Sequence, residues 1–171
     1  MWPHLAVQLD AVVDALDLHD GDWVVDCTLG AGGHAERILE IADTRLLGID
    51  RDPTALEIAT RRLARFGDRV HLIHGHFVEL KQHLAASGIS QVDGMLFDLG
   101  VSSPQLDEAA RGFSFQGDGP LDMRMDPSKS GTAADLINQW SEAEMADVIF
   151  QFGEERFSRR IARAIVSARE R

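Results

Sequence analysis

Short apolar runs alternate with helically spaced apolar positions along the first hundred residues of the chain. The runs predict four buried strands, at 23–27, 45–50, 70–74 and 92–98. Apolar residues three and four apart predict helices over 5–16, 35–42, 53–66 and 80–86. Strands that alternate with helices indicate βαβ units, and right-handed crossovers predict a parallel sheet with the strand order 3-2-1-4. The pattern therefore predicts an α/β fold with a parallel sheet.

The alternation stops after Asp98, where a long polar and glycine-rich segment begins and continues to about Gly131. Beyond it, apolar positions predict one helix through 136–149 and another through 157–168. Loops of this length are uncommon in compact domains unless they are functional. Open α/β sheets bind their ligands outside the carboxyl ends of the strands, which is where this segment starts. We therefore expect part of the functional site here.

Composition and charge narrow the classes of protein. Of the 171 residues, 44% are hydrophobic and 26% are charged, as in soluble globular proteins, and no apolar run reaches the length of a membrane span. The single cysteine, Cys27, excludes an internal disulfide and fits a cytoplasmic location. A net charge of −11 disfavours nonspecific nucleic-acid binding. However, Arg156, Arg160 and Arg163 share one helix face near the end of the chain, so the net charge does not exclude a local RNA-binding surface.

A glycine cluster at 30–34 directly follows the first predicted strand. Glycines in such a place let the backbone approach a ligand and expose the N–H groups that begin the next helix. The cluster satisfies a loose dinucleotide-binding pattern, which is a weak signal by itself. Asp26 ends the first strand and Asp50 ends the second, where an acid typically accepts hydrogen bonds from ribose hydroxyls. Together these features predict a nucleoside-containing cofactor.

Two cofactor classes fit this pattern. The acid before the glycines, Asp26, disfavours the pyrophosphate of a nicotinamide cofactor and suits the cationic methionine part of S-adenosyl-L-methionine. An NAD(P)-dependent oxidoreductase stays as an alternative. No metal site is predicted, because His71 and His74 point to opposite faces of their strand and no cysteine joins them.

Seven blocks spread over nearly the whole chain resemble those of the ribosomal small-subunit methyltransferase H family, also called RsmH or MraW. They lie at 32–34, 49–53, 74–77, 98–107, 111–115, 119–127 and 153–157. The resemblance implies a class I S-adenosyl-L-methionine methyltransferase sheet, followed by the start of an inserted helical domain. It also implies methylation of the exocyclic N4 of a cytidine in 16S ribosomal RNA, with the small ribosomal subunit as partner.

The resemblance further implies how the chain is divided. Residues 1–99 are expected to form the S-adenosyl-L-methionine-binding Rossmann-like domain. Residues 100–171 are expected to form the catalytic loop and part of a helical substrate-recognition insert. Members of the family are longer, so the chain resembles a truncated product, and a remnant that binds cofactor or RNA without turnover is a second hypothesis. The uncovered edge of the fourth strand predicts self-association into a homo-oligomer.

Carried over residue by residue, the resemblance assigns cofactor binding to seven positions: Gly32, Gly33, His34, Asp50, Phe77, Asp98 and Gln105. From sequence position alone, His34 is either a cofactor contact or a solvated side chain, and Phe77 is either a wall of the adenine pocket or a core residue. Other amino-methyltransferases hold the target amine on a short polar motif containing proline. By that analogy, the catalytic candidates are Ser102, Ser103 and Pro104.

Overall fold

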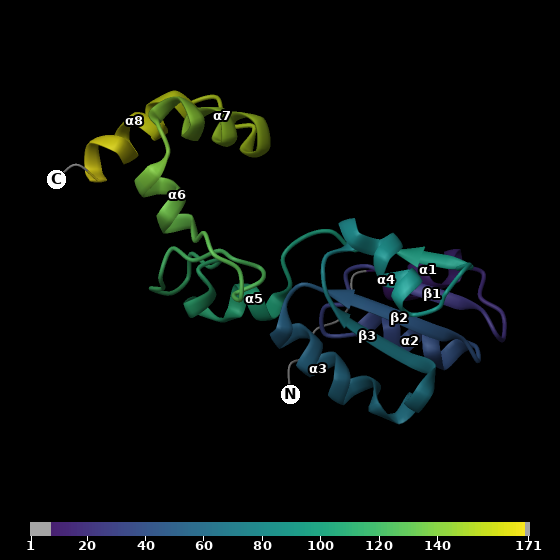
Figure 1. Cartoon of the computed structure of the whole chain (residues 1–171). Helices are drawn as coiled ribbons and strands as arrows, with labels where there is room; N and C mark the ends of the chain where they lie inside the picture. Colours follow the sequence, from purple (N-terminus) through teal and green to yellow (C-terminus); the bar gives the residue numbers. More distant parts are fainter. Residues whose placement is uncertain (1–7, 170–171) are drawn as a thin grey trace. The chain divides into compact units, whose positions relative to one another are not determined.

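The computed structural model describes residues 8–169 and separates into two compact units, Met1–Pro104 and Gln105–Arg171 (Figure 1). The predicted division between 99 and 100, and the roles given to the two parts, stay predictions. None of the helices within residues 8–169 has the length and apolar character needed to cross a membrane.

The first unit is built on a four-stranded parallel sheet in the order β3-β2-β1-β4, which confirms the predicted order. Its strands are β1 (Trp23–Asp26), β2 (Arg45–Asp50), β3 (Val70–His74) and β4 (Gly94–Leu96). The prediction of β4 over 92–98 is too long. Since β1 ends at Asp26, β4 has no partner strand beyond Leu96. The backbone N–H of Asp98 instead donates to the hydroxyl of Thr28, at 2.7 Å.

Helices cover both faces of this sheet (Figure 1). They are α1 (Leu9–Ala15), α2 (Gly33–Ile41), α3 (Pro53–Leu63) and α4 (Leu80–Ala86). Successive strand residues point to opposite faces, so Val24 and Leu46 pack with α1, α2 and α3, whereas Val25 and Leu47 pack on the α4 side. Strands buried on both faces read as continuous apolar runs, which is why the sequence predicted them well.

The predicted bounds of two helices in this unit differ from those of the structure. Part of the first, 5–7, lies outside the described residues. The helix predicted over 53–66 is too long, because α3 ends at Leu63 and a 3-10 helix, η1 (Ala64–Arg69), follows. Gly67 interrupts η1 with φ 59° and ψ −130°, a conformation that no helical residue adopts.

The second unit is mainly helical. The helix α5 (Ser103–Asp107) begins in the first unit and ends in the second. The second unit then contains η3 (Ala109–Arg111), α6 (Ala133–Gln139), α7 (Glu142–Gly153) and α8 (Ser158–Arg169). Its buried apolar cluster consists of Met145, Ala146 and Ala162, with Trp140 packed against it. This core is small compared with that of the first unit, so other interactions must order the second unit.

The single helix predicted through 136–149 is wrong, because α6 and α7 are separate helices. Ser141 caps α7: its hydroxyl accepts the backbone N–H of Glu144 at 3.3 Å. The carboxylate of Glu144 accepts the backbone N–H of Ser141 at 2.8 Å, which completes a capping box. Trp140 is extended, with ψ 149°, so the chain turns between the helices.

The polar segment before α6 is ordered by two arginines. The guanidinium of Arg111 donates to the backbone carbonyl oxygens of Arg124 and Met125, at 3.0 and 3.1 Å. Arg124 pairs with both carboxylate oxygens of Asp122, and this hydrogen bonding lowers the pKa of Asp122 to about 2. A Cβ on Gly119 would overlap the carbonyl oxygen of Ala109, so the chain passes itself here more closely than any side chain would allow.

Candidate cofactor site at the carboxyl end of the sheet

The turn between β1 and α2 depends on two glycines. Gly30 and Gly32 have φ of 52° and 77°, in the left-handed region that favours glycine. A Cβ on Gly32 would lie 3.4 Å from atoms of both Ala59 and Leu63. Gly32 therefore lets the start of α2 pack closely on α3. Its predicted contact with the cofactor stays a prediction.

Asp50 fastens this turn to the end of β2. One carboxylate oxygen accepts the N–H of Gly30 at 2.7 Å, and the other accepts the N–H of Asp52 at 2.8 Å. Burial raises the pKa of Asp50, and the two N–H groups oppose that effect. Each carboxylate oxygen has a further lone pair, so the same group could still accept a ribose hydroxyl.

Asp26 lies beneath the turn and is 1% exposed. It accepts the N–H of Thr28 at 3.1 Å. Burial, together with the negative charges of Asp50 and Asp98, raises the pKa of Asp26 to about 7, although the N–H of Thr28 opposes this shift. Burial, together with the charge of Asp26, also raises the pKa of Cys27 to about 11. Cys27 is thus a neutral buried thiol.

Asp98 and His34 face one another across the turn. A carboxylate oxygen of Asp98 lies 4.0 Å from Nδ1 of His34. The Asp98 side chain is half exposed, whereas that of His34 is only 8% exposed. The alternative in which His34 is solvated is therefore wrong. The carboxylates of Asp50 and Asp98 make this edge of the sheet negative, and Asp26 adds a further negative charge above about pH 7.

A cavity of about 300 Å³ opens beside the turn. Five predicted site residues line it: Gly33, His34, Asp98, Ser102 and Pro104. Thr28 and Arg62 also line it, and the sequence analysis missed both. Thr28 could have been found from its place between Asp26 and the glycine cluster. Arg62 could not, since nothing in the helical pattern of α3 distinguishes it from its neighbours.

The remaining predicted residues lie elsewhere. Phe77 begins the 3-10 helix η2 (Phe77–Glu79), and its ring packs edge to face against Phe97 at 5.6 Å between centroids. Of the residues that the structure describes, neither Phe77 nor Ser103 is among those lining the cavity. Gln105 belongs to the second unit, where it is buried. The functional roles of all three stay predictions.

Sequence comparison decides between the two cofactor classes. The sequence matches the MraW methylase family over residues 1–171. The chain belongs to the MraW methylase family. S-adenosyl-L-methionine is the cofactor that this family uses, which confirms the predicted cofactor.

Curated relatives within the MraW family carry the name ribosomal RNA small subunit methyltransferase H. The protein from Sorangium cellulosum is 54% identical over 165 residues, which are 96% of this chain and 52% of that protein. The protein from Carboxydothermus hydrogenoformans is 49% identical over 99% of this chain and 55% of its own length. The protein from Mycobacterium tuberculosis is 56% identical over 88% of this chain and 39% of its own length. The chain thus spans about half the length of these relatives.

Among solved structures, the chain resembles a SAM-dependent methyltransferase from Thiobacillus denitrificans in complex with S-adenosyl-L-homocysteine. The two are 28% identical, with a TM-score of 0.38, over 43% of this chain and 31% of that one. This likeness is too low to inform the site.

Proposed function

We propose that this chain carries the cofactor site of a ribosomal RNA methyltransferase that acts on the exocyclic N4 of a cytidine in 16S ribosomal RNA. The observation that carries the proposal is the gathering of Asp26, Asp50 and Asp98 around the glycine turn at the carboxyl end of the sheet. Negative charge here attracts a cationic cofactor and repels a pyrophosphate, which also disfavours the oxidoreductase alternative. The names of the relatives support the choice of RNA.

The residues present fit S-adenosyl-L-methionine. Asp50 would accept the ribose hydroxyls with the lone pairs that its two N–H bonds leave over. Gly33 and the other turn residues would expose backbone N–H groups to the ligand at the cavity wall. Asp98, half exposed beside His34, would offer a carboxylate to the cationic part. When bound, this cofactor supplies an electrophilic methyl group on a sulfonium centre.

The protein's own contribution to methylation would be to orient the amine and to accept a hydrogen bond from it. The N4 amine of cytosine is a poor nucleophile, because its lone pair is delocalised into the ring. Ser102 and Pro104 line the same cavity as Asp98. A hydroxyl or carbonyl oxygen there would accept an N–H of the amine, localise its lone pair and stabilise the positive charge that develops on nitrogen. Correct positioning supplies much of the remaining rate.

The proposal is tested by methyl transfer to small ribosomal subunits from cells that lack this methylation. We expect the nucleosides to contain N4-methylcytidine after incubation with radiolabelled S-adenosyl-L-methionine. The longer Carboxydothermus hydrogenoformans relative serves as the positive control. Asp98→Asn should abolish the signal, whereas Asp14→Asn, which changes an exposed acid of α1, should keep it. Cofactor binding without any methyl transfer would favour the remnant hypothesis, and the absence of cofactor binding would contradict the proposal itself.

We also propose that the protein acts in the cytoplasm and that it self-associates through the edge of its sheet. β4 lies at the edge of the sheet, and Met95 and Phe97 in and after it are about half exposed. Such an edge can pair with another chain. Sedimentation velocity over a range of concentrations checks this, and a monomer throughout the range would contradict it.

A further inference from the structure

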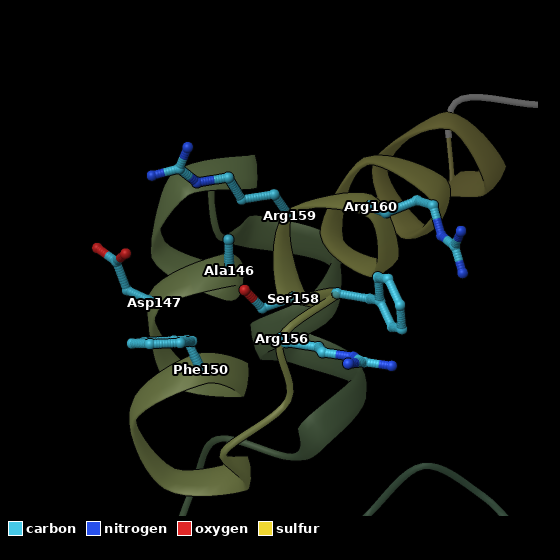
Figure 2. A pocket seen from close by; sticks show the side chains of 8 residues that line it. Ala146, Asp147, Phe150, Arg156, Ser158, Arg159 and Arg160 are labelled. Atoms are coloured by element: carbon cyan, nitrogen blue, oxygen red, sulfur yellow. The ribbon is translucent and has the colours of Figure 1, made fainter.

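The second unit contains a pocket of about 450 Å³ where α7 meets the start of α8 (Figure 2). Its lining is Ala146, Asp147 and Phe150 from α7, and residues 156–160 from the beginning of α8 and the turn before it. The pocket combines exposed aromatic rings with arginine side chains. It belongs to no part of the cofactor site described above.

Two arginines of this pocket lie against one aromatic ring. The guanidinium carbons of Arg156 and Arg160 lie 4.8 and 4.6 Å from the centroid of the Phe157 ring. Phe157 is 44% exposed, and both arginines are exposed. Arg156 and Arg160 project to the same side of the helix pair (Figure 2). We call Arg156, Phe157 and Arg160 the arginine–aromatic cluster.

The positive charge of this cluster is not neutralised within residues 8–169. Neither Arg156 nor Arg160 forms an ion pair with a described carboxylate. Their two positive charges lie over the same ring and therefore repel each other. Arg163 differs, since its guanidinium lies 3.3 Å from the carboxylate of Glu142. The predicted face of Arg156, Arg160 and Arg163 is therefore divided into an unpaired part and a paired part.

The neighbouring acids do not cancel this charge either. The carboxylate of Glu155 accepts the backbone N–H of Phe157 at 2.7 Å, so it is bonded to the backbone and not to either arginine of the cluster. Asp147 is the one carboxylate that lines the pocket, and it projects with Arg159 to the side opposite Arg156 and Arg160 (Figure 2). In a chain with a net charge of −11, an exposed pair of uncompensated guanidinium groups is complementary to an anion.

We propose that the arginine–aromatic cluster binds an unpaired segment of RNA. Guanidinium N–H groups would donate to phosphate oxygens, and the guanidinium planes, supported by the Phe157 ring, would stack on a base. A duplex hides the faces of its bases, so this combination favours single strands. The inference rests on the proposed function, because a ribosomal RNA methyltransferase has to hold RNA around its target.

The test measures RNA binding by the full chain with fluorescence anisotropy. The probe is a labelled oligocytidylate of about ten nucleotides, titrated between about 50 and 300 mM NaCl. We expect the double variant Arg156→Gln/Arg160→Gln to bind about tenfold or more weakly. The slope of log affinity against log salt should also decrease by about 1.4, for two lost phosphate contacts.

Two single variants separate stacking from charge. Phe157→Leu keeps an apolar side chain but removes the ring, so affinity should fall by about fivefold or more with an unchanged salt slope. Arg163→Gln removes an arginine of the same helix that Glu142 already neutralises, so it should change affinity less than about twofold. A circular dichroism spectrum of each variant shows whether α7 and α8 are kept.

Several outcomes would overturn the inference. These are a double variant that binds like the parent, an Arg163→Gln variant that loses as much, or a duplex of equal length that binds as well as the single strand. If the double variant differs from the parent in sedimentation coefficient but not in RNA affinity, the cluster contacts protein and not RNA. Cofactor affinity and methyl transfer are measured on the same preparations. A parent chain that binds RNA through the cluster but binds no S-adenosyl-L-methionine would contradict the proposed function alone.

Discussion

The first unit buries apolar strands on both faces of its sheet, whereas the second unit has a buried apolar cluster of three residues and many local polar bonds. The first is ordered by burial, which depends on the pattern of many residues. The second is ordered by capping boxes and by arginines that donate to backbone carbonyl groups, which depend on particular residues. The charged groups differ as well, because acids gather at the glycine turn of the first unit, whereas exposed arginines line the pocket of the second.

The largest expected effect tests whether burial matters more in the first unit. Leu47 is completely buried in β2, whereas Leu136 in α6 is 38% exposed. We expect Leu47→Ala to lower the free energy of unfolding by about 2–5 kcal/mol. Leu136→Ala should lower it by about 1 kcal/mol or less. Urea unfolding followed by hydrogen exchange in each unit measures both, and equal losses would show that the comparison is wrong.

Asp26 gives the second prediction, in which stability and function change in opposite directions. The pKa of Asp26 is raised from 3.8 to about 7, so the folded protein holds a proton that the unfolded chain releases. The free energy of unfolding therefore falls as the pH rises from about 4 to 7 and stays low above 7. Asp26→Asn should remove this dependence and raise the free energy of unfolding at pH 8 by about 2–4 kcal/mol.

Above about pH 7, the Asp26→Asn variant should also bind S-adenosyl-L-methionine more weakly, because the parent then carries a negative charge near the cationic cofactor that the variant lacks. The asparagine oxygen can still accept the N–H of Thr28, so the turn should be kept. Urea titrations at pH 5 and pH 8 provide the measurement. Asp14→Asn is the matched control, since this acid is exposed. If the variant is no more stable than the parent at pH 8, burial of the Asp26 carboxylate does not destabilise the folded protein.

Asp50 provides the third prediction, which concerns cofactor affinity. Asp50→Ala removes the acceptor for ribose hydroxyls and also the acceptor for the N–H of Gly30. We expect S-adenosyl-L-methionine affinity to fall by about 1–3 kcal/mol in isothermal calorimetry. Asp14→Ala should leave the affinity unchanged. If Asp50→Ala binds the cofactor like the parent, Asp50 does not belong to the site.

The smallest expected effect lies in the second unit. Ser141→Ala removes the side chain that caps α7 and should cost about 1 kcal/mol of local stability, while Ser141→Asp should keep the cap. Hydrogen exchange of the first amides of α7 reports the change. The amides of β1 and β2 serve as an internal control. Equal protection in the alanine variant and the parent would mean that packing, and not the cap, begins this helix.

The same difference explains what could be predicted from the sequence. The four strands, their order and the helices between them follow from apolar runs and spacing, because the first unit is ordered by burial. The break between α6 and α7 was missed because apolar spacing continues across it. The capping box that causes the break consists of two polar residues, Ser141 and Glu144. Five of the ten predicted site residues line the cavity, but Arg62 reaches it through tertiary packing that no local pattern records.

The arrangement around Arg111 and Arg124 has a consequence for how the polar segment tolerates sequence change. These two side chains hold the path of the backbone by donating to its carbonyl groups, and a carbonyl group is the same whatever residue carries it. Exposed positions such as Phe115 and Asp118 could therefore be exchanged widely without moving the segment. Selection for a new substrate could act on the surface of this segment while its shape stays fixed by two arginines.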